Sequence, residues 1–142
     1  MASQEPRDGR VLRLLRGLGL TVAIGGAAGS VALMIRAGER TPLFLLVLFI
    51  FWVLAPFGAL LWANATSTHW SAATRATLFG VTLVVALGSL AIYGDLIDIR
   101  PSGAANAFPF VIVPPAAILL MAIVLPTVAV AARPRSGRGG AA

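Results

Sequence analysis

The sequence predicts an all-α integral membrane protein, a four-helix bundle built from two antiparallel helical hairpins. Of the 142 residues, 58% are hydrophobic and only 11% are charged. A soluble domain carries roughly a quarter charged residues, so lipid must replace water over most of this protein's surface. The apolar residues also fall into four runs long enough to cross a bilayer core of about 30 Å. One membrane domain, residues 1–142, accommodates all four runs.

The first predicted span covers residues 14–35. It follows a polar tail, residues 1–13, and Gly17 to Ile35 carries no charge. A cleaved signal peptide is the alternative, because a basic start precedes an apolar run. The length of the run and the membrane segments after it favour a retained helix.

The second predicted span, residues 43–63, contains no charged or amide side chain. Thr41 is expected to cap this helix, with Pro42 in its first turn. Pro56 removes a backbone donor inside the span and predicts a break or kink there. A polar loop, residues 64–75, should follow at the membrane interface, because Trp62 and Trp70 flank it.

The third predicted span covers residues 76–94, with Gly94 as its C-terminal cap. The fourth covers residues 107–132, and either Ser102 or Asn106 is expected to cap its start. A basic tail, residues 133–142, ends the chain.

Prolines inside the fourth span predict helix breaks at membrane depth. Pro114, Pro115 and Pro126 leave the carbonyl groups four residues earlier without their usual donors. Lipid cannot satisfy those carbonyls, so a neighbouring helix or water must do so. Freed carbonyls bind ions in some transporters. A bent structural helix is the alternative interpretation.

Arginine placement predicts the topology. With four spans, the two termini and the loop 64–75 share one side of the membrane. Eight of the eleven arginines fall on that side, against Arg36, Arg40 and Arg100 on the other. The positive-inside rule therefore places both termini in the cytoplasm, with the protein as a multi-pass component of the cytoplasmic (inner) membrane. The arginines expected on the cytoplasmic side are Arg7, Arg10, Arg13, Arg16, Arg75, Arg133, Arg135 and Arg138.

The net charge of +6 would suggest nucleic acid as the partner of a soluble protein. Here we expect the arginine-rich termini to contact anionic lipid headgroups of the bilayer, with no nucleic acid partner. The chain has no cysteine, and no motif predicts a cofactor.

Small residues on the first span predict close helix packing. Gly25 and Gly29 are four apart, as are Gly26 and Ser30, so another backbone can approach each pair. The partner helix belongs either to a second copy, in a homo-oligomer, or to the same chain. Both alternatives stay open.

Asp95 and Asp98 are candidate ion or ligand residues. They lie three apart after the third span, so a helical extension would place both on one face. Charges at a helix end that only set orientation are the alternative. His69 falls on the opposite side of the membrane in the four-span topology, which excludes a metal site built from all three. The sequence contains no catalytic triad, phosphate loop or zinc motif, and we expect the protein not to be an enzyme.

Ser102 to Pro114 forms a small polar entry that leads into Phe and then Pro. This stretch is similar to the last helix of small uncharacterised four-span membrane proteins of bacteria, a resemblance that covers only the last third of the chain and implies no activity. The fluoride channels and the small multidrug exporters also have four spans. Leu43–Ala63 and Ala76–Gly94 lack the polar motifs of the former, and residues 9–38 lack the acidic residue of the latter.

These features predict a structural, accessory or interaction subunit of a bacterial membrane, packed against itself or within a larger membrane complex. The alternative function is a small ion or solute channel or transporter that acts as an oligomer.

Overall fold

Four long helices and one short 3-10 helix make up the computed structural model, which describes residues 5–132. The long helices are α1 (Glu5–Ala37), α2 (Leu43–Thr66), α3 (Ala72–Tyr93) and α4 (Phe108–Ala131), and η1 (Ser67–His69) joins α2 to α3. All four are long and apolar enough to cross a membrane. The predicted fold class, an all-α four-helix bundle, is confirmed, and the protein is a small multi-pass membrane protein.

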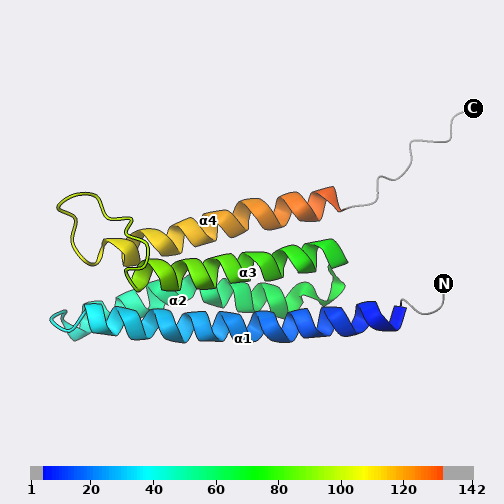
Figure 1. Ribbon diagram of the computed structural model, residues 1–142, viewed down its shortest axis with the longest axis horizontal. Coiled ribbons are helices and arrows are strands. Elements are labelled where there is room, and N and C mark those ends of the chain that lie inside the picture. The colour runs from blue at the N-terminus through cyan, green and yellow to red at the C-terminus, as the bar shows by residue number, and fades with distance from the viewer. Residues whose placement is uncertain (1–4, 133–142) are drawn as a thin grey trace, which may run out of the picture.

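Consecutive helices run antiparallel, so α1 and α3 point the same way (Figure 1). α1 and α4 lie on opposite sides of the bundle, and each packs against both α2 and α3. One end of the bundle holds the start of α1, η1 and the end of α4. We call it the terminal end. The other, the turn end, holds the connections 38–42 and 94–107.

Three helices are longer than the apolar runs predicted. α1 covers Glu5–Ala37 and so includes most of the expected tail. The expected loop 64–75 is mostly helical, since α2 continues to Thr66, η1 follows and α3 begins at Ala72. The tail 133–142 lies outside the described residues.

The helix caps agree with the predictions only in part, and one of them was not predicted. Ser71 caps α3, where its hydroxyl accepts a hydrogen bond of 3.2 Å from the amide of Thr74. Pro42, not Thr41, is the residue before α2, and no side chain caps that helix. Ala107 precedes α4, also without a side-chain cap, so the prediction of a cap by Asn106 or Ser102 is wrong. Gly94 is the C-cap of α3, as predicted.

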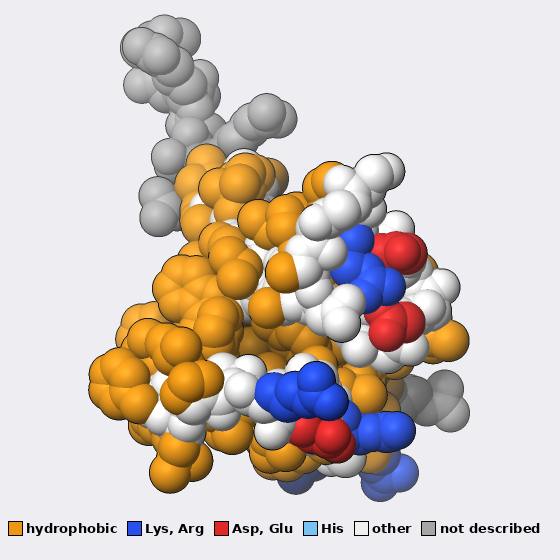
Figure 2. Space-filling view, turned by 90° about the vertical axis from the view of Figure 1, so that its left-hand side faces the viewer, with side chains coloured by type: hydrophobic (Ala, Val, Ile, Leu, Met, Phe, Trp, Pro, Cys, Tyr) orange, Lys and Arg blue, Asp and Glu red, His pale blue; other side chains and the backbone are white. Residues whose placement is uncertain are grey.

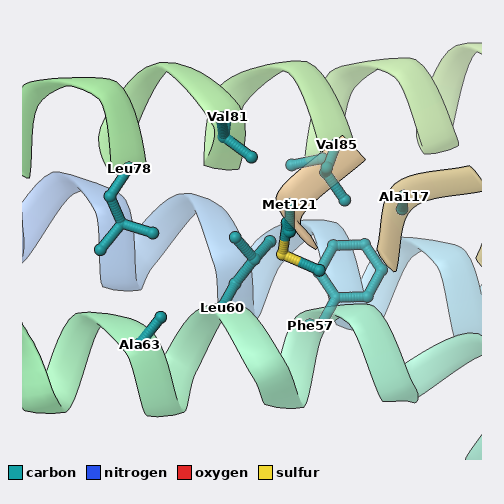
Figure 3. Close-up of a cluster of buried hydrophobic side chains, with 9 residues drawn as sticks. Phe57, Leu60, Ala63, Leu78, Val81, Val85, Ala117 and Met121 are labelled. Atoms are coloured by element: carbon teal, nitrogen blue, oxygen red, sulfur yellow. The ribbon is translucent and has the colours of Figure 1, made fainter. Parts of the chain in front are cut away.

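The centre of the bundle is a mainly apolar layer. Phe57 and Leu60 of α2 meet Val81 and Val85 of α3, and Met121 of α4 lies against Phe57 (Figure 3). Phe57, Leu60 and Val85 are each less than 5% exposed. Toward the turn end, Tyr93 of α3 stacks on Phe110 of α4, with ring centroids 4.4 Å apart. This layer leaves the outer faces of the helices apolar and exposed, as lipid contact requires.

The small residues of α1 divide between two faces. A Cβ atom added at Gly26 would lie 2.8 Å from Cβ of Ala86, and one at Gly29 would lie 2.5 Å from Cδ2 of Leu90. Ser30 is fully buried, so Gly26, Gly29 and Ser30 belong to a contact within the chain. Gly25 differs, because nothing lies within 4 Å of a Cβ placed there.

Candidate functional site

The prolines predicted to break α4 lie inside a continuous helix. α4 runs from Phe108 to Ala131 through Pro114, Pro115 and Pro126, and α2 likewise continues through Pro56. Pro56 and Pro114 are buried between helices, whereas Pro115 and Pro126 are exposed on the outer surface. The structure therefore shows α2 and α4 as continuous helices through the prolines at which breaks were predicted.

One carbonyl freed by these prolines has a partner on a neighbouring helix. Pro115 has no N–H to donate to the carbonyl of Val111. The indole Nε1 of Trp52, on α2, donates to that carbonyl oxygen instead, at 3.4 Å. The expectation that a neighbouring helix satisfies a freed carbonyl holds at this position. Sequence reasoning did not identify Trp52 as the donor.

An apolar groove surrounds this hydrogen bond on the outer surface of α2 and α4. It measures about 620 Å³ and is lined by Leu48, Phe49, Phe51, Trp52, Ala55 and Val111. Trp52 is 45% exposed and Phe51 is 70% exposed. In a bilayer the groove faces hydrocarbon, so the indole and the carbonyl satisfy one another where lipid offers neither a donor nor an acceptor.

The connection between α3 and α4 carries the two candidate carboxylates, and Arg100 binds both. Its guanidinium lies 3.1 Å from Asp95 and 3.0 Å from Asp98. The backbone N–H of Arg100 also donates to Asp98, at 2.9 Å, and its Nη1 donates to the amide oxygen of Asn106, at 3.2 Å. Figure 2, which looks onto the turn end, shows acidic and basic side chains side by side within a largely hydrophobic surface.

These contacts change the electrostatics of the loop. The hydrogen bonds from Arg100 hold the pKa of Asp98 below its usual range, and Asp98 in turn raises the pKa of Arg100. Both carboxylates already have a cationic partner, so a metal ion would have to displace a guanidinium to bind them. The geometry supports an exposed cluster of ion pairs around Arg100 more directly than an ion-binding site.

Asp95 and Asp98 do not share a helix face, because α3 ends at Tyr93. The loop that follows brings both to Arg100. Asp95 adopts a left-handed conformation, with φ of 58°. The amide of Leu96 donates to the carbonyl of Ala91, and that of Asp95 to the carbonyl of Ile92. This pattern is a Schellman motif, in which the left-handed position normally belongs to glycine.

The terminal end holds a second polar group, formed where α1, α2 and α3 converge. Asn64 is 6% exposed and its Nδ2 lies 3.5 Å from the carbonyl oxygen of Arg16, which links α2 to α1. Ser67 donates to the carbonyl of Asn64 at 2.7 Å. Nε of Arg75 is buried and has no hydrogen-bond partner among the residues that the structure describes. His69 lies at this same end, away from Asp95 and Asp98, as the four-span topology predicted.

Comparisons with protein-family models, with curated proteins and with solved structures gave no match. The function must therefore be inferred from the sequence and the geometry of the chain.

Proposed function

We propose that this protein is a structural or accessory subunit of the cytoplasmic membrane of a bacterium, without catalytic activity and with both termini in the cytoplasm. The orientation follows from the positive-inside rule, since Arg10, Arg13, Arg16 and Arg75 belong to the terminal end. Partners in a larger membrane complex would contact the exposed apolar faces of the helices.

The mainly apolar centre of the bundle is the observation that carries this proposal. A path for ions or polar solutes through one copy needs polar groups or water across the hydrocarbon region. Phe57, Leu60, Val85 and Met121 occupy that position instead, and the hydroxyl of the buried Thr82 donates to the carbonyl of Leu78 within its own helix. The paired carboxylates of the turn end support the same conclusion, since Arg100 occupies them.

A channel or transporter formed by several copies is the second candidate, and Gly25 favours it. Gly25 is exposed on α1 with open space around it, so a helix from a second copy can approach closely there. The pore would then lie between copies and not within one.

Flux through liposomes separates the two candidates. The purified full chain is reconstituted, and release of ions and small solutes is compared with empty liposomes. The accessory role predicts no release above the empty control, together with migration in a larger assembly after gentle solubilisation. Release that Asp98→Asn or Pro114→Ala abolishes would establish the transport function and contradict the accessory role.

A further inference from the structure

A small cleft at the terminal end brings two arginines from different helices together. Arg16 of α1 and Arg75 of α3 line it, with Asn64 and Ser67 of the α2–η1 segment. Leucine and phenylalanine side chains of α1 and α3 complete the lining, and the cleft measures about 20 Å³. Its lining therefore combines basic and polar groups with apolar side chains.

One buried donor of this cleft is unsatisfied. Nε of Arg75 is buried with no acceptor among the residues described. Nδ2 of Asn64 has only the long contact of 3.5 Å to a backbone carbonyl. The hydroxyl of Ser67 is already donating to the carbonyl of Asn64. A buried guanidinium nitrogen without an acceptor costs free energy, so the group that completes this cleft must supply acceptor oxygens.

Charge indicates which kind of acceptor is missing. The carboxylates between residues 9 and 132 belong to Glu39, Asp95 and Asp98, and all three lie at the turn end. Arg100 holds the two aspartates there. The cleft therefore presents two cationic groups with no counter-charge from this part of the chain.

We propose that the cleft binds the phosphate group of an anionic phospholipid. Arginine suits phosphate because its planar fork of donors matches the phosphate oxygens. A volume of about 20 Å³ admits one oxygen atom, so a single phosphate oxygen enters while the rest of the headgroup stays at the surface. Basic pockets between membrane helices on the cytoplasmic side bind such headgroups.

Lipid binding in the cleft depends on the membrane location of the bundle and not on the accessory role. A failure of one proposal therefore leaves the other standing. A free phosphate ion shares the same chemistry. The apolar walls of the cleft and its place at the end of three membrane helices favour the lipid, whose acyl chains lie against the same helices.

Native mass spectrometry of the full chain in detergent tests the proposal, with phosphatidylglycerol, phosphatidylcholine and inorganic phosphate as probes. We expect phosphatidylglycerol to bind at least about tenfold more tightly than phosphatidylcholine. Arg75→Gln should weaken phosphatidylglycerol binding by about tenfold, the loss of one charge-assisted hydrogen bond. Arg40→Gln, an exposed arginine at the turn end, is the matched control and should leave binding unchanged.

Arg16→Gln keeps the proposal testable if Arg75→Gln does not fold, because Arg16 is exposed and its replacement disturbs no packing. Equal affinity of wild type and both glutamine variants for phosphatidylglycerol would overturn the proposal. That result would mean that water, or a carboxylate elsewhere in the chain, already satisfies Arg75. Binding of inorganic phosphate as tightly as phosphatidylglycerol would overturn the assignment to lipid.

Discussion

The indole Nε1 of Trp52 lies 3.4 Å from the carbonyl oxygen of Val111, the carbonyl that Pro115 leaves without its helical donor. The two groups come from α2 and α4 and meet on the outer surface of the bundle. In water, an exposed hydrogen bond of this kind contributes little to stability, because water can replace either partner. In hydrocarbon each group depends on the other, because lipid cannot replace either.

Trp52→Phe should therefore destabilise the folded protein by about 1 kcal/mol, a usual value for one hydrogen bond between membrane helices. The measurement is equilibrium unfolding in mixed detergent micelles. Trp62→Phe is the matched control, because Trp62 is an exposed tryptophan on the same helix and its indole has no hydrogen-bond partner among the residues described. Pro115→Ala supplies an amide N–H near Val111, so in that background Trp52→Phe should cost less. Equal costs in both backgrounds would show that the indole does not serve this carbonyl.

Gly26 and Gly25 are adjacent on α1 but should respond oppositely to alanine. Gly26→Ala places Cβ 2.8 Å from Ala86 and 2.9 Å from the Phe57 ring, and should destabilise by about 1–3 kcal/mol. Gly25→Ala meets open space and should be neutral or stabilising by up to about 1 kcal/mol, through helix propensity. The same unfolding assay measures both. If Gly25→Ala instead lowers the unfolding free energy of the purified protein by as much as Gly26→Ala does, a second copy packs against the Gly25 face.

Asp95 tests whether backbone conformation or charge matters at the end of α3. Asp95→Ala should destabilise by about 1 kcal/mol, because alanine tolerates the left-handed conformation less well than aspartate does. Asp95→Gly should be neutral or stabilising, since glycine adopts φ of 58° freely and an exposed ion pair contributes little. Thermal denaturation followed by circular dichroism ranks the variants. A loss in Asp95→Gly as large as in Asp95→Ala would assign the effect to the pair with Arg100.

Asp98 should titrate at lower pH than an ordinary aspartate. Its folded pKa is depressed, so its contribution to stability is present above the unfolded pKa, near 4, and is lost as pH falls through the folded pKa. Carboxyl-carbon NMR of selectively labelled protein in micelles follows this titration. Arg100→Gln should move the titration upward, toward the usual range. Arg36→Gln, at the same end of the bundle, should not move it.

Local sequence was enough to predict the four helices, because a run of some 20 apolar residues can satisfy its backbone in lipid only as a helix. It also predicted that a neighbouring helix or water must satisfy the carbonyls freed by the prolines. The local sequence did not predict contacts between residues that lie far apart in the chain. Nothing local to Trp52 marks it as a donor 59 residues away from Val111.

The turn end shows the same limit. Asn106 has the usual character of a helix cap, yet its side-chain oxygen accepts from Arg100 instead. Spacing alone placed Asp95 and Asp98 on a helix face, whereas the loop folds both onto one guanidinium. In both cases the contact with Arg100 in the folded loop replaced the arrangement that the local sequence favours.

We infer that the chain crosses the bilayer four times, with the terminal end in the cytoplasm. The chain has no cysteine, so single cysteines can be introduced and labelled without a background. A membrane-impermeant maleimide applied from outside intact cells should label Ser102→Cys and spare Thr68→Cys until the membrane is opened. Ala59→Cys, on the exposed face of α2 between the two ends, should resist labelling in both conditions. Labelling of Thr68→Cys and Ser102→Cys from the same side of the membrane would contradict the account.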